Sequence, residues 1–459
     1  MIPMVDTLTG GTLDALFVYL SILGMLLLVA TVLRLKVPIL KKYHIPAALI
    51  AGVIGLIMGP YFLGIIPKTI TTVWSNMSGR LIVLVFAPML MGKSEKLTGS
   101  KEFVKKSICS ASWCYLACAA QYAIPILLTA LLLTPMFGVD PLFGATVEAG
   151  WAGGHGTAAG MAAVYEELGW MDGQSLAVTS ATFGLAFGII GGVILINIGV
   201  RKGWAACLTH SAGITNDENE LYTGENRPVN TRSSVSGGVV DNLAFHAAIL
   251  SVAVFFGYIL NVTIKKFTGI SISWFVTALF GGLFLQKILD RTPWGDAVDK
   301  ATLSRIQGLA LEFLVAGAVA SVNVSVVIEF AIPLLVTQVS MAVVMVFLNT
   351  WYARRTLGDY WFEQSMVLFG TFTGVAATGM LLLKTCDPEA KSDALTVYAA
   401  RAPFTSWAVG GGLITSLAPV WIAQYGALPV GLGFLAAGVF CFILPKLIGH
   451  WNKHPGYNN

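Results

Sequence analysis

Apolar runs of about 20 residues recur along the whole chain and constrain its fold more than any other feature. Stretches such as 13–33, 174–200 and 427–449 hold almost no charged side chains. A helix of about 20 apolar residues is long enough to cross a lipid bilayer. Of the 459 residues, 56% are hydrophobic and 11% are charged, whereas about 25% are charged in a soluble domain. The sequence therefore predicts an all-α polytopic membrane protein, with the lipid bilayer as its main surroundings.

On this template we expect eleven membrane-crossing helices. A polar loop at 201–241 separates the first five helices from the others, and two further apolar stretches, 142–166 and 363–384, are left over. The expected helices are 13–33, 45–66, 80–92, 107–136, 174–200, 242–262, 271–289, 306–322, 326–349, 403–423 and 427–449.

Lysine and arginine residues predict the orientation, because short cytoplasmic loops collect them. With the N-terminus outside and the C-terminus inside, 24 of the 28 Lys and Arg residues fall in or beside cytoplasmic loops. The four that remain outside are Lys68, Arg80, Lys265 and Lys266. The short segment 80–92 must cross for this bias to hold, since otherwise the lysines of 93–106 would change sides.

The flanks of the two leftover stretches indicate that each returns to the side from which it entered. Stretch 142–166 has acidic residues and no Lys or Arg at either end (Asp140; Glu166, Glu167 and Asp172). Stretch 363–384 has basic residues at both ends (Arg354 and Arg355; Lys384, Lys391 and Arg401). We expect re-entrant hairpins, one entering from outside and one from inside. The alternative, two ordinary spanning helices, would invert 201–349 as a block.

With these hairpins the chain divides into two similar halves of five crossings each. An odd number of crossings inverts the second half relative to the first, and "QYAIP" (121–125) is echoed by "EFAIP" (329–333). Inverted repeats with interrupted segments are typical of secondary transporters. We expect a first repeat at 1–200, a cytoplasmic linker at 201–241, a second repeat at 242–423 and an additional transmembrane helix within 424–459.

Glycines and polar side chains coincide at the middle of both hairpins, in "GGHGT" (153–157) and "FTGVAATG" (372–379). Backbone groups exposed at membrane depth need protein, water or a ligand as partners. Helix N-termini there favour an anion, while carbonyl and hydroxyl oxygens suit a hard cation. The alternative is close helix packing, which we expect for "GIIGG" (188–192), "GG" (281–282) and "GGG" (410–412). A lone His155 does not make a transition-metal site; it either donates to a substrate carboxylate or bonds a loop carbonyl.

The first hairpin and the helix after it, "VDPLFGATVEAGWAGGHGTAAGMAAVYEELGW" and "SATFGLAFGIIGG", resemble the bacterial sodium/glutamate symporters (the ESS family), and "FGTFTGVAATGMLLLKTCDPE" is similar to their second hairpin. The resemblance implies sodium-driven uptake of glutamate across the bacterial inner membrane by a homodimer, with an elevator-type moving part and a fixed scaffold. It implies substrate-binding tips formed by Gly153, Gly154, His155, Gly156 and Thr157, and by Thr373, Gly374, Thr378 and Gly379, with Thr182 in the following helix. The chain departs from the family pattern at Glu148 and Trp151, in "ARAPFTSWAVGGG", which lacks the Asp and Asn of some relatives, and in its last helix.

Further polar residues in apolar helices are candidate ligands. We expect sodium oxygens among Ser180, Thr182, Thr405, Ser406, Gln121 and Gln338, although the two glutamines would serve equally to bond helix to helix. Arg401 would pair with a second substrate carboxylate or anchor a cytoplasmic helix end. Glu312 would carry a proton or make an interhelical hydrogen bond.

The resulting functional prediction is a sodium-coupled symporter for glutamate or a similar small anionic amino acid, with Na⁺ as coupling ion, no organic cofactor and no nucleic-acid partner. An ion channel with re-entrant filter loops and a transporter of a different carboxylate are the alternatives. Filter loops usually form around an axis shared by several subunits, which two dissimilar tips in one chain fit poorly. An enzyme using His155 is not expected, because only Glu148 and Thr157 lie nearby as partners and no catalytic spacing links them.

Overall fold

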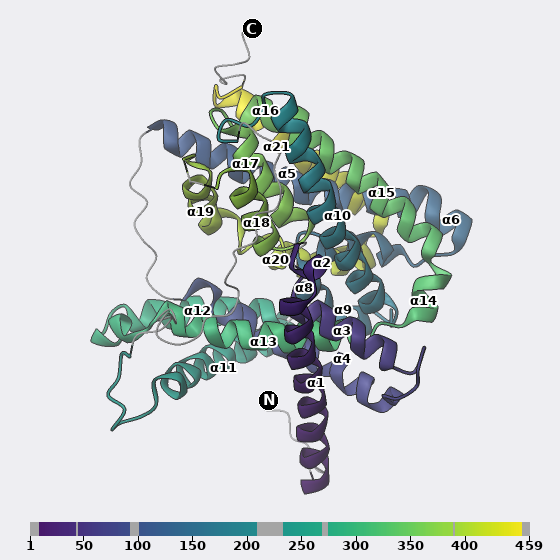
Figure 1. The fold of residues 1–459 in the computed structure, drawn as a ribbon, viewed down its shortest axis with the longest axis vertical. Coiled ribbons are helices and arrows are strands. Elements are labelled where there is room, and N and C mark those ends of the chain that lie inside the picture. The colour runs from purple at the N-terminus through teal and green to yellow at the C-terminus, as the bar shows by residue number, and fades with distance from the viewer. Residues whose placement is uncertain are drawn as a thin grey trace. The chain divides into compact units, whose positions relative to one another are not determined.

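The computed structural model describes residues 9–42, 45–91, 101–208, 233–268, 274–388 and 391–451, and within these residues all regular structure is helical (Figure 1). Eight helices are long and apolar enough to cross a membrane: Gly10–Lys36, Lys68–Met89, Lys101–Phe137, Gly173–Arg201, Asn242–Phe267, Lys300–Ala320, Ala331–Thr356 and Ala427–Leu447. Most of the expected linker 201–241 lies outside the described residues. The prediction of an all-helical chain with many candidate spans is confirmed.

Three of the eleven expected crossings are shorter helices. They correspond to α3 (Ala47–Met58), α12 (Trp274–Leu289) and the pair α19 (Ala394–Thr405) and α20 (Leu413–Tyr425). The prediction of one helix over 403–423 is wrong, because residues 406–412 break it. The glycines of "GGG" (410–412) lie in this break, so their expected role in close helix packing is wrong as well.

The expected short crossing 80–92 is part of a longer helix, α4, which runs from Lys68 to Phe86 and continues as a 3-10 turn. Its polar first half concealed it in the sequence. Within the helix Ser78 is fully buried and donates to the carbonyls of Trp74 and Leu314, so the polar side chains find partners in the protein. Lys68 and Arg80 therefore belong to a helix and not to an external loop.

The chain divides into two compact units, each built from both halves of the sequence. The first unit comprises Met1–Glu95, Ala159–Val164 and Asp217–Val322, and the second comprises Lys96–Ala158, Tyr165–Asn216 and Asn323–Asn459. Within the described residues the first unit holds the early helices of each half and the second unit the later ones. The division passes through α8 (Gly154–Gly160) and α9 (Ala162–Glu167).

The first unit packs α1 (Gly10–Lys36), α2 (Pro38–Lys42), α3 and α4 with α11 (Asn242–Thr268), α12 and α13 (Lys300–Ala320). Small residues allow close helix contact: Gly52 and Gly55 of α3 lie against Val319 and Ala320 of α13. The fully buried Trp74 donates its indole N–H to the carbonyl of Tyr19 at 3.0 Å. Direct helix packing with few polar contacts therefore holds this unit.

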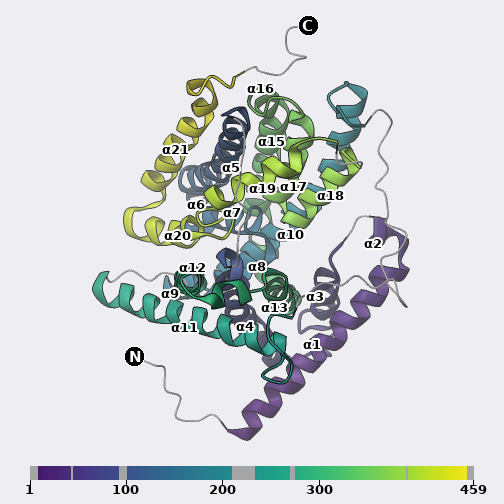
Figure 2. The same ribbon diagram turned by 90° about the vertical axis from the view of Figure 1, so that its left-hand side faces the viewer.

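The second unit is built around α10 (Gly173–Arg201). Its other main helices are α5 (Lys101–Leu128), α15 (Ala331–Phe347), α17 (Trp361–Thr373), α18 (Ala376–Cys386), α19, α20 and α21 (Ala427–Leu447). Short helices join them: α6 (Thr134–Phe137), α7 (Thr146–Gly150), α14 (Val324–Glu329) and α16 (Ala353–Thr356). Helix α21 packs along α5 (Figure 2). Three helical segments of this unit are interrupted, at 151–153, 374–375 and 406–412.

Candidate functional site

The first interrupted segment, α7 with α8 and α9, can be followed along α10 by its contacts. Gly150 packs against Ala177 and Ser180 of α10, and Trp151 lies at Gly184. The chain then turns, because Tyr165 lies at Gly173, back at the first residue of α10. The segment thus advances along the first part of α10 as far as Gly184 and returns.

The second interrupted segment follows α10 from its opposite end. Phe362, near the start of α17, lies at Gly199, while Thr373 at its end lies at Gly188. Helix α18 then runs back, with Leu382 at Gly192. The backbones of α17 and α18 touch at Gly370 and Gly379, so the two helices form a tight pair (Figure 1).

The two interruptions meet in the middle of α10. Gly154 has a left-handed backbone, with φ of +69°, and a Cβ placed on it would lie 2.9 Å from Val375 Cγ1 and 3.0 Å from the Gly374 carbonyl oxygen. A Cβ placed on Gly184, in the middle of α10, would likewise overlap the Thr373 carbonyl oxygen. Only glycine permits both the backbone conformation at 154 and this close approach. The two predicted tips are therefore in contact.

Two mid-helix glutamines each bond the interrupted segment of the other half. Gln121 of α5 donates to the Phe372 carbonyl at 2.7 Å, and the Gln338 Oε1 of α15 accepts the indole N–H of Trp151. Gln338 also donates to the fully buried Ser180 at 2.9 Å. These contacts place both amides beside the interruptions. Among the described residues, no group donates a hydrogen bond to the buried Gln121 Oε1.

His155 lies in the first turn of α8, buried, with its Nε2 3.1 Å from Thr182 Oγ1. The Thr182 hydroxyl donates to the Val178 carbonyl, so its oxygen is left to accept from His155. This assigns the proton of the neutral imidazole to Nε2. The neighbouring tip residues Gly156 and Thr157 are also buried. Among the predicted residues, the structure thus brings His155 and Thr182 together.

The second tip is lined by hydroxyls. Thr373 is fully buried and donates to the Phe369 carbonyl at 2.8 Å. Thr378, one turn into α18, has its Oγ1 beside Gly374. Gly379 lies against α17 and serves the packing of the pair. Thr373 and Thr378 therefore place oxygens at the point where the tips meet.

Arg401 of α19 is buried, with 5% of its surface exposed, and lies near the same tip. Its guanidinium donates to Thr405 Oγ1 at 3.0 Å and stacks over the rings of Tyr398 and Phe372. Its Nε has no hydrogen-bond partner, and no carboxylate pairs with it among the described residues. A buried cation without an anion is costly, so this position suits an anionic ligand. Ser406 follows at the end of α19 and is partly exposed, and its backbone N–H donates to the Ala402 carbonyl.

The third interruption, absent from our prediction, is bonded to the first through a carboxylate. Glu148 of α7 is fully buried and accepts from the Gly410 backbone N–H at 2.9 Å, from the Thr415 hydroxyl at 3.1 Å and from the Tyr122 hydroxyl. The Gly410 backbone also lies close to the Ala152 carbonyl. The sequence signal was present: "TSWAVGGGLITS" combines glycines with hydroxyl residues, as both tips do.

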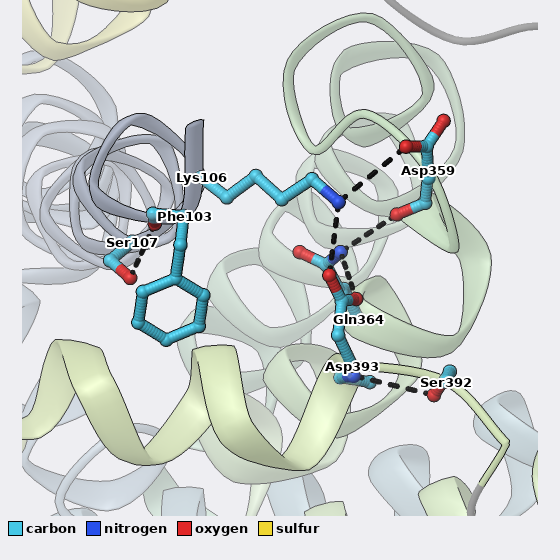
Figure 3. A network of polar contacts seen from close by, with 8 residues as sticks. Phe103, Lys106, Ser107, Asp359, Gln364, Ser392 and Asp393 are labelled. Atoms are coloured by element: carbon cyan, nitrogen blue, oxygen red, sulfur yellow. Dashed lines mark hydrogen bonds and ion pairs between the residues drawn. The ribbon is translucent and has the colours of Figure 1, made fainter. Parts of the chain in front are cut away.

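An ionic network fixes the ends of the helices that carry these residues (Figure 3). Lys106 of α5 lies 2.9 Å from Asp393, which precedes α19, and 3.5 Å from Asp359, which precedes α17. Gln364 of α17 donates to the Asp359 carbonyl and to Asp393 Oδ1. The starts of α17 and α19 are thereby joined to α5.

The chemistry available at this site is binding rather than bond-breaking. Backbone groups, hydroxyls, two amides, one imidazole and one guanidinium surround the meeting point of the tips. No group of three or more His, Cys, Asp or Glu side chains suited to a metal ion occurs in the part of the chain that the structure describes. Carbonyl and hydroxyl oxygens are nevertheless the ligands that hard cations prefer.

Comparison with known proteins identifies the family. No curated protein matches the chain. Among solved structures, the sodium proton antiporter MjNhaP1 from Methanocaldococcus jannaschii is similar over 94% of this chain and 99% of its own, with 16% sequence identity and a TM-score of 0.37. The sequence model of the sodium/glutamate symporter family matches residues 12–380. The chain belongs to the sodium/glutamate symporter family, a family of transporters.

Proposed function

We propose that this chain is a sodium-coupled symporter of glutamate or a similar small anionic amino acid, working by elevator-type alternating access. Membership of the family supports sodium coupling and transport of an amino acid. Secondary transporters bind their cargo at interrupted helices near the middle of the membrane. The second unit contains such interruptions and would be the part that moves, and the first unit would be the scaffold.

The observation that carries the proposal is the meeting of two interrupted segments from opposite ends of α10. Contacts at Gly173 and Gly184 follow the first segment, and contacts at Gly199 and Gly188 follow the second. If α10 crosses the membrane, each segment enters and leaves on its own side, as re-entrant hairpins do. Bare backbone at this depth is stable only where protein, water or a ligand satisfies it.

The substrate anion would bind between the N–H groups of the first tip and Arg401, while His155, whose Nε2–H donates to Thr182, would hold the first tip against α10. Arg401 is buried and has no carboxylate partner among the described residues, so it would take the side-chain carboxylate of glutamate. The α-carboxylate would lie at the start of α8, beside Gly153, Gly154, Gly156 and Thr157.

Sodium would bind to oxygens on the other side of the meeting point. Gln121 Oε1 is a buried carbonyl oxygen without a hydrogen-bond partner among the described residues, and the hydroxyls of Thr182 and Thr378 would complete such a site. Thr405 accepts from Arg401, so Thr405 and the adjacent Ser406 would instead support the anion side. Ser180 and Gln338 are bonded to each other and to Trp151, so they would act by holding the first tip in place. Thr373 and Gly374 would contribute carbonyl oxygens.

The distribution of helices between the two units supports the proposal of two inverted repeats. Each unit takes corresponding helices from residues 1–200 and 242–423, as two inverted repeats would require, with 201–241 as linker and 424–459 as an added helix. Gln121 donates to the second interrupted segment and Gln338 accepts from the first, so each half bonds the segment of the other. We propose an N-terminus outside and a C-terminus inside, in the bacterial inner membrane, and assembly as a homodimer.

Uptake of labelled glutamate into proteoliposomes tests the function. An inward sodium gradient should drive saturable accumulation, and replacing sodium by choline should abolish it. Equal uptake with and without sodium would refute the coupling. A conductance that does not saturate with substrate would instead favour the ion channel, and competition only by other carboxylates would point to a different cargo.

A further inference from the structure

Glu148 is a buried carboxyl in an apolar helix with no cation beside it. It is fully buried in α7, two residues before Gly150, which packs on α10. Its partners are all neutral: the Gly410 N–H and the hydroxyls of Thr415 and Tyr122. A charged side chain inside a membrane is costly and usually functional. The cost of burying this carboxyl therefore indicates a functional role.

The titratable groups that face Glu148 are weak acids. They are Tyr122 and Cys118, both of α5, and, further away, Tyr165 of α9. From α20 the facing group is Thr415, and the third interruption contributes only its Gly410 backbone. No Lys, Arg or His contacts the carboxyl within the described ranges. Within the part of the chain that the structure describes, no cation thus balances the charge of Glu148.

The hydrogen bonds leave one position for a proton. The Gly411 N–H donates to Thr415 Oγ1, so the Thr415 hydroxyl proton is free to point at Glu148 Oε1. Oε1 also accepts a hydrogen bond from the Gly410 N–H, and a backbone N–H can only donate. Oε1 is therefore an acceptor in both charge states. Oε2, which faces the Tyr122 hydroxyl, is the atom that would carry the proton.

We propose that Glu148 is the binding site of a co-transported proton, in addition to the sodium site. This inference rests on the proposed function. On one side of the membrane, Oε2 takes a proton from hydronium and an O–H bond forms. On the other side, the proton returns to water and the carboxylate is restored, with no change in oxidation state. Symport is the expected direction, because an ionised Glu148 close to the first tip would repel an anionic substrate.

Hydrogen bonds couple the charge state of Glu148 to the first and third interruptions. Its own backbone carbonyl accepts the N–H of Gly153 at 3.0 Å, so it is bonded to the first interruption. Its carboxyl holds Gly410 in the third interruption. Gain or loss of the proton on Oε2 therefore changes the strength of the hydrogen bond from the Gly410 N–H to Oε1, because a bond to a charged acceptor is stronger than one to a neutral acceptor. This change would accompany binding of the anion between the tips.

Proton movement in proteoliposomes tests the inference. The variant Glu148→Gln keeps the shape of the side chain and a carbonyl oxygen in the place of Oε1, but it cannot bind or release a proton. A pH-sensitive dye inside the vesicles reports protons while labelled glutamate uptake is followed in parallel. We expect the wild type to acidify the lumen in step with glutamate uptake. In Glu148→Gln, the number of protons moved per glutamate taken up should fall at least tenfold. Its apparent glutamate affinity should also lose its dependence on pH.

Glu363→Gln is the matched control. Glu363 is likewise fully buried, but its Oε1 accepts the N–H groups of Ala206 and Cys207, away from the tips. Its glutamine variant keeps that acceptor, so proton movement per glutamate should stay within twofold of the wild type. Tyr122→Phe provides a second probe, because it keeps the carboxyl and removes its Oε2 partner. Proton movement should persist there with a shifted pH midpoint.

The outcomes separate this inference from the proposed function. Sodium-driven glutamate uptake without any proton movement in the wild type would overturn the inference and leave the function standing. Proton movement at the wild-type ratio in Glu148→Gln would overturn it as well. Absence of ion-driven glutamate uptake in the wild type would instead be a failure of the proposed function. Size-exclusion profiles and melting temperatures of the variants establish that each is folded.

Discussion

Replacing Gly154 by alanine should separate the two tips. At this position a Cβ meets Val375 Cγ1 at 2.9 Å and the Gly374 carbonyl oxygen at 3.0 Å. The carbonyl belongs to the backbone of the second interruption and has little room to move. Overpacking of this kind costs about 1–3 kcal/mol. The left-handed backbone of Gly154, with φ of +69°, adds about 1–2 kcal/mol for any residue with a Cβ.

A matched variant isolates the contact from the backbone strain. Gly138 has φ of +65°, and a Cβ there would meet nothing within 4 Å. Gly138→Ala therefore carries the strain alone, whereas Gly154→Ala carries strain and clash. The difference of about 1–3 kcal/mol corresponds to an additional loss of about 5- to 150-fold in affinity or rate.

Uptake of labelled glutamate into proteoliposomes, with kcat and KM determined for both variants, measures this difference. We expect Gly154→Ala to raise the apparent KM, or lower kcat/KM, at least fivefold beyond Gly138→Ala. Comparable melting temperatures would show that the loss is local to the site. Equal transport by the two variants would refute the reasoning, because the tips would then not need to touch.

Three further predictions follow from single contacts. Arg401→Gln should weaken glutamate binding by about 10- to 150-fold, since a hydrogen bond to a charged group is worth about 1.5–3 kcal/mol. Titration calorimetry measures the affinity for glutamate, and an unchanged affinity would exclude Arg401 from the site. Gly52→Ala should destabilise the first unit by about 1–3 kcal/mol through its clash on α13, seen as a lower melting temperature, whereas Gly308→Ala, with open space around it, should not. Gln338→Leu leaves the Trp151 N–H without its acceptor, at a cost of about 1–3 kcal/mol, and should reduce transport at least about fivefold. Wild-type transport rates would show that this bond is dispensable.

Long apolar helices and the two tips could be predicted from the sequence for physical reasons. A run of about 20 apolar residues has few alternatives to a membrane helix, and glycines beside polar side chains interrupt such a run. The contact between Gly154 and Gly374 follows from the same logic, since both lie in these interruptions. Pairing of His155 with Thr182 was not predictable, because it depends on how α8 packs on α10.

Helices of mixed composition were harder to predict. The polar start of α4 conceals a helix whose Ser78 finds its partners in α13, and such tertiary partners leave no local trace. The break at 410–412 was missed for another reason: glycine triplets also serve helix packing, and only the flanking Thr405 and Thr415 distinguish the two roles. Glu148 was noted as a departure from the family pattern, but its partners Gly410 and Thr415 lie far away in the sequence.

The most direct test of the central claim is the sidedness of residues that flank the two interrupted segments. Single cysteines at Asp140, Glu167, Arg355 and Lys384, in a variant without the six native cysteines, would be labelled in intact cells with a reagent that does not cross membranes. The account predicts that the cysteines at 140 and 167 react from outside, whereas those at 355 and 384 react only after the membrane is opened. Labelling of 140 and 167 from opposite faces would contradict it, since the first segment would then run straight through.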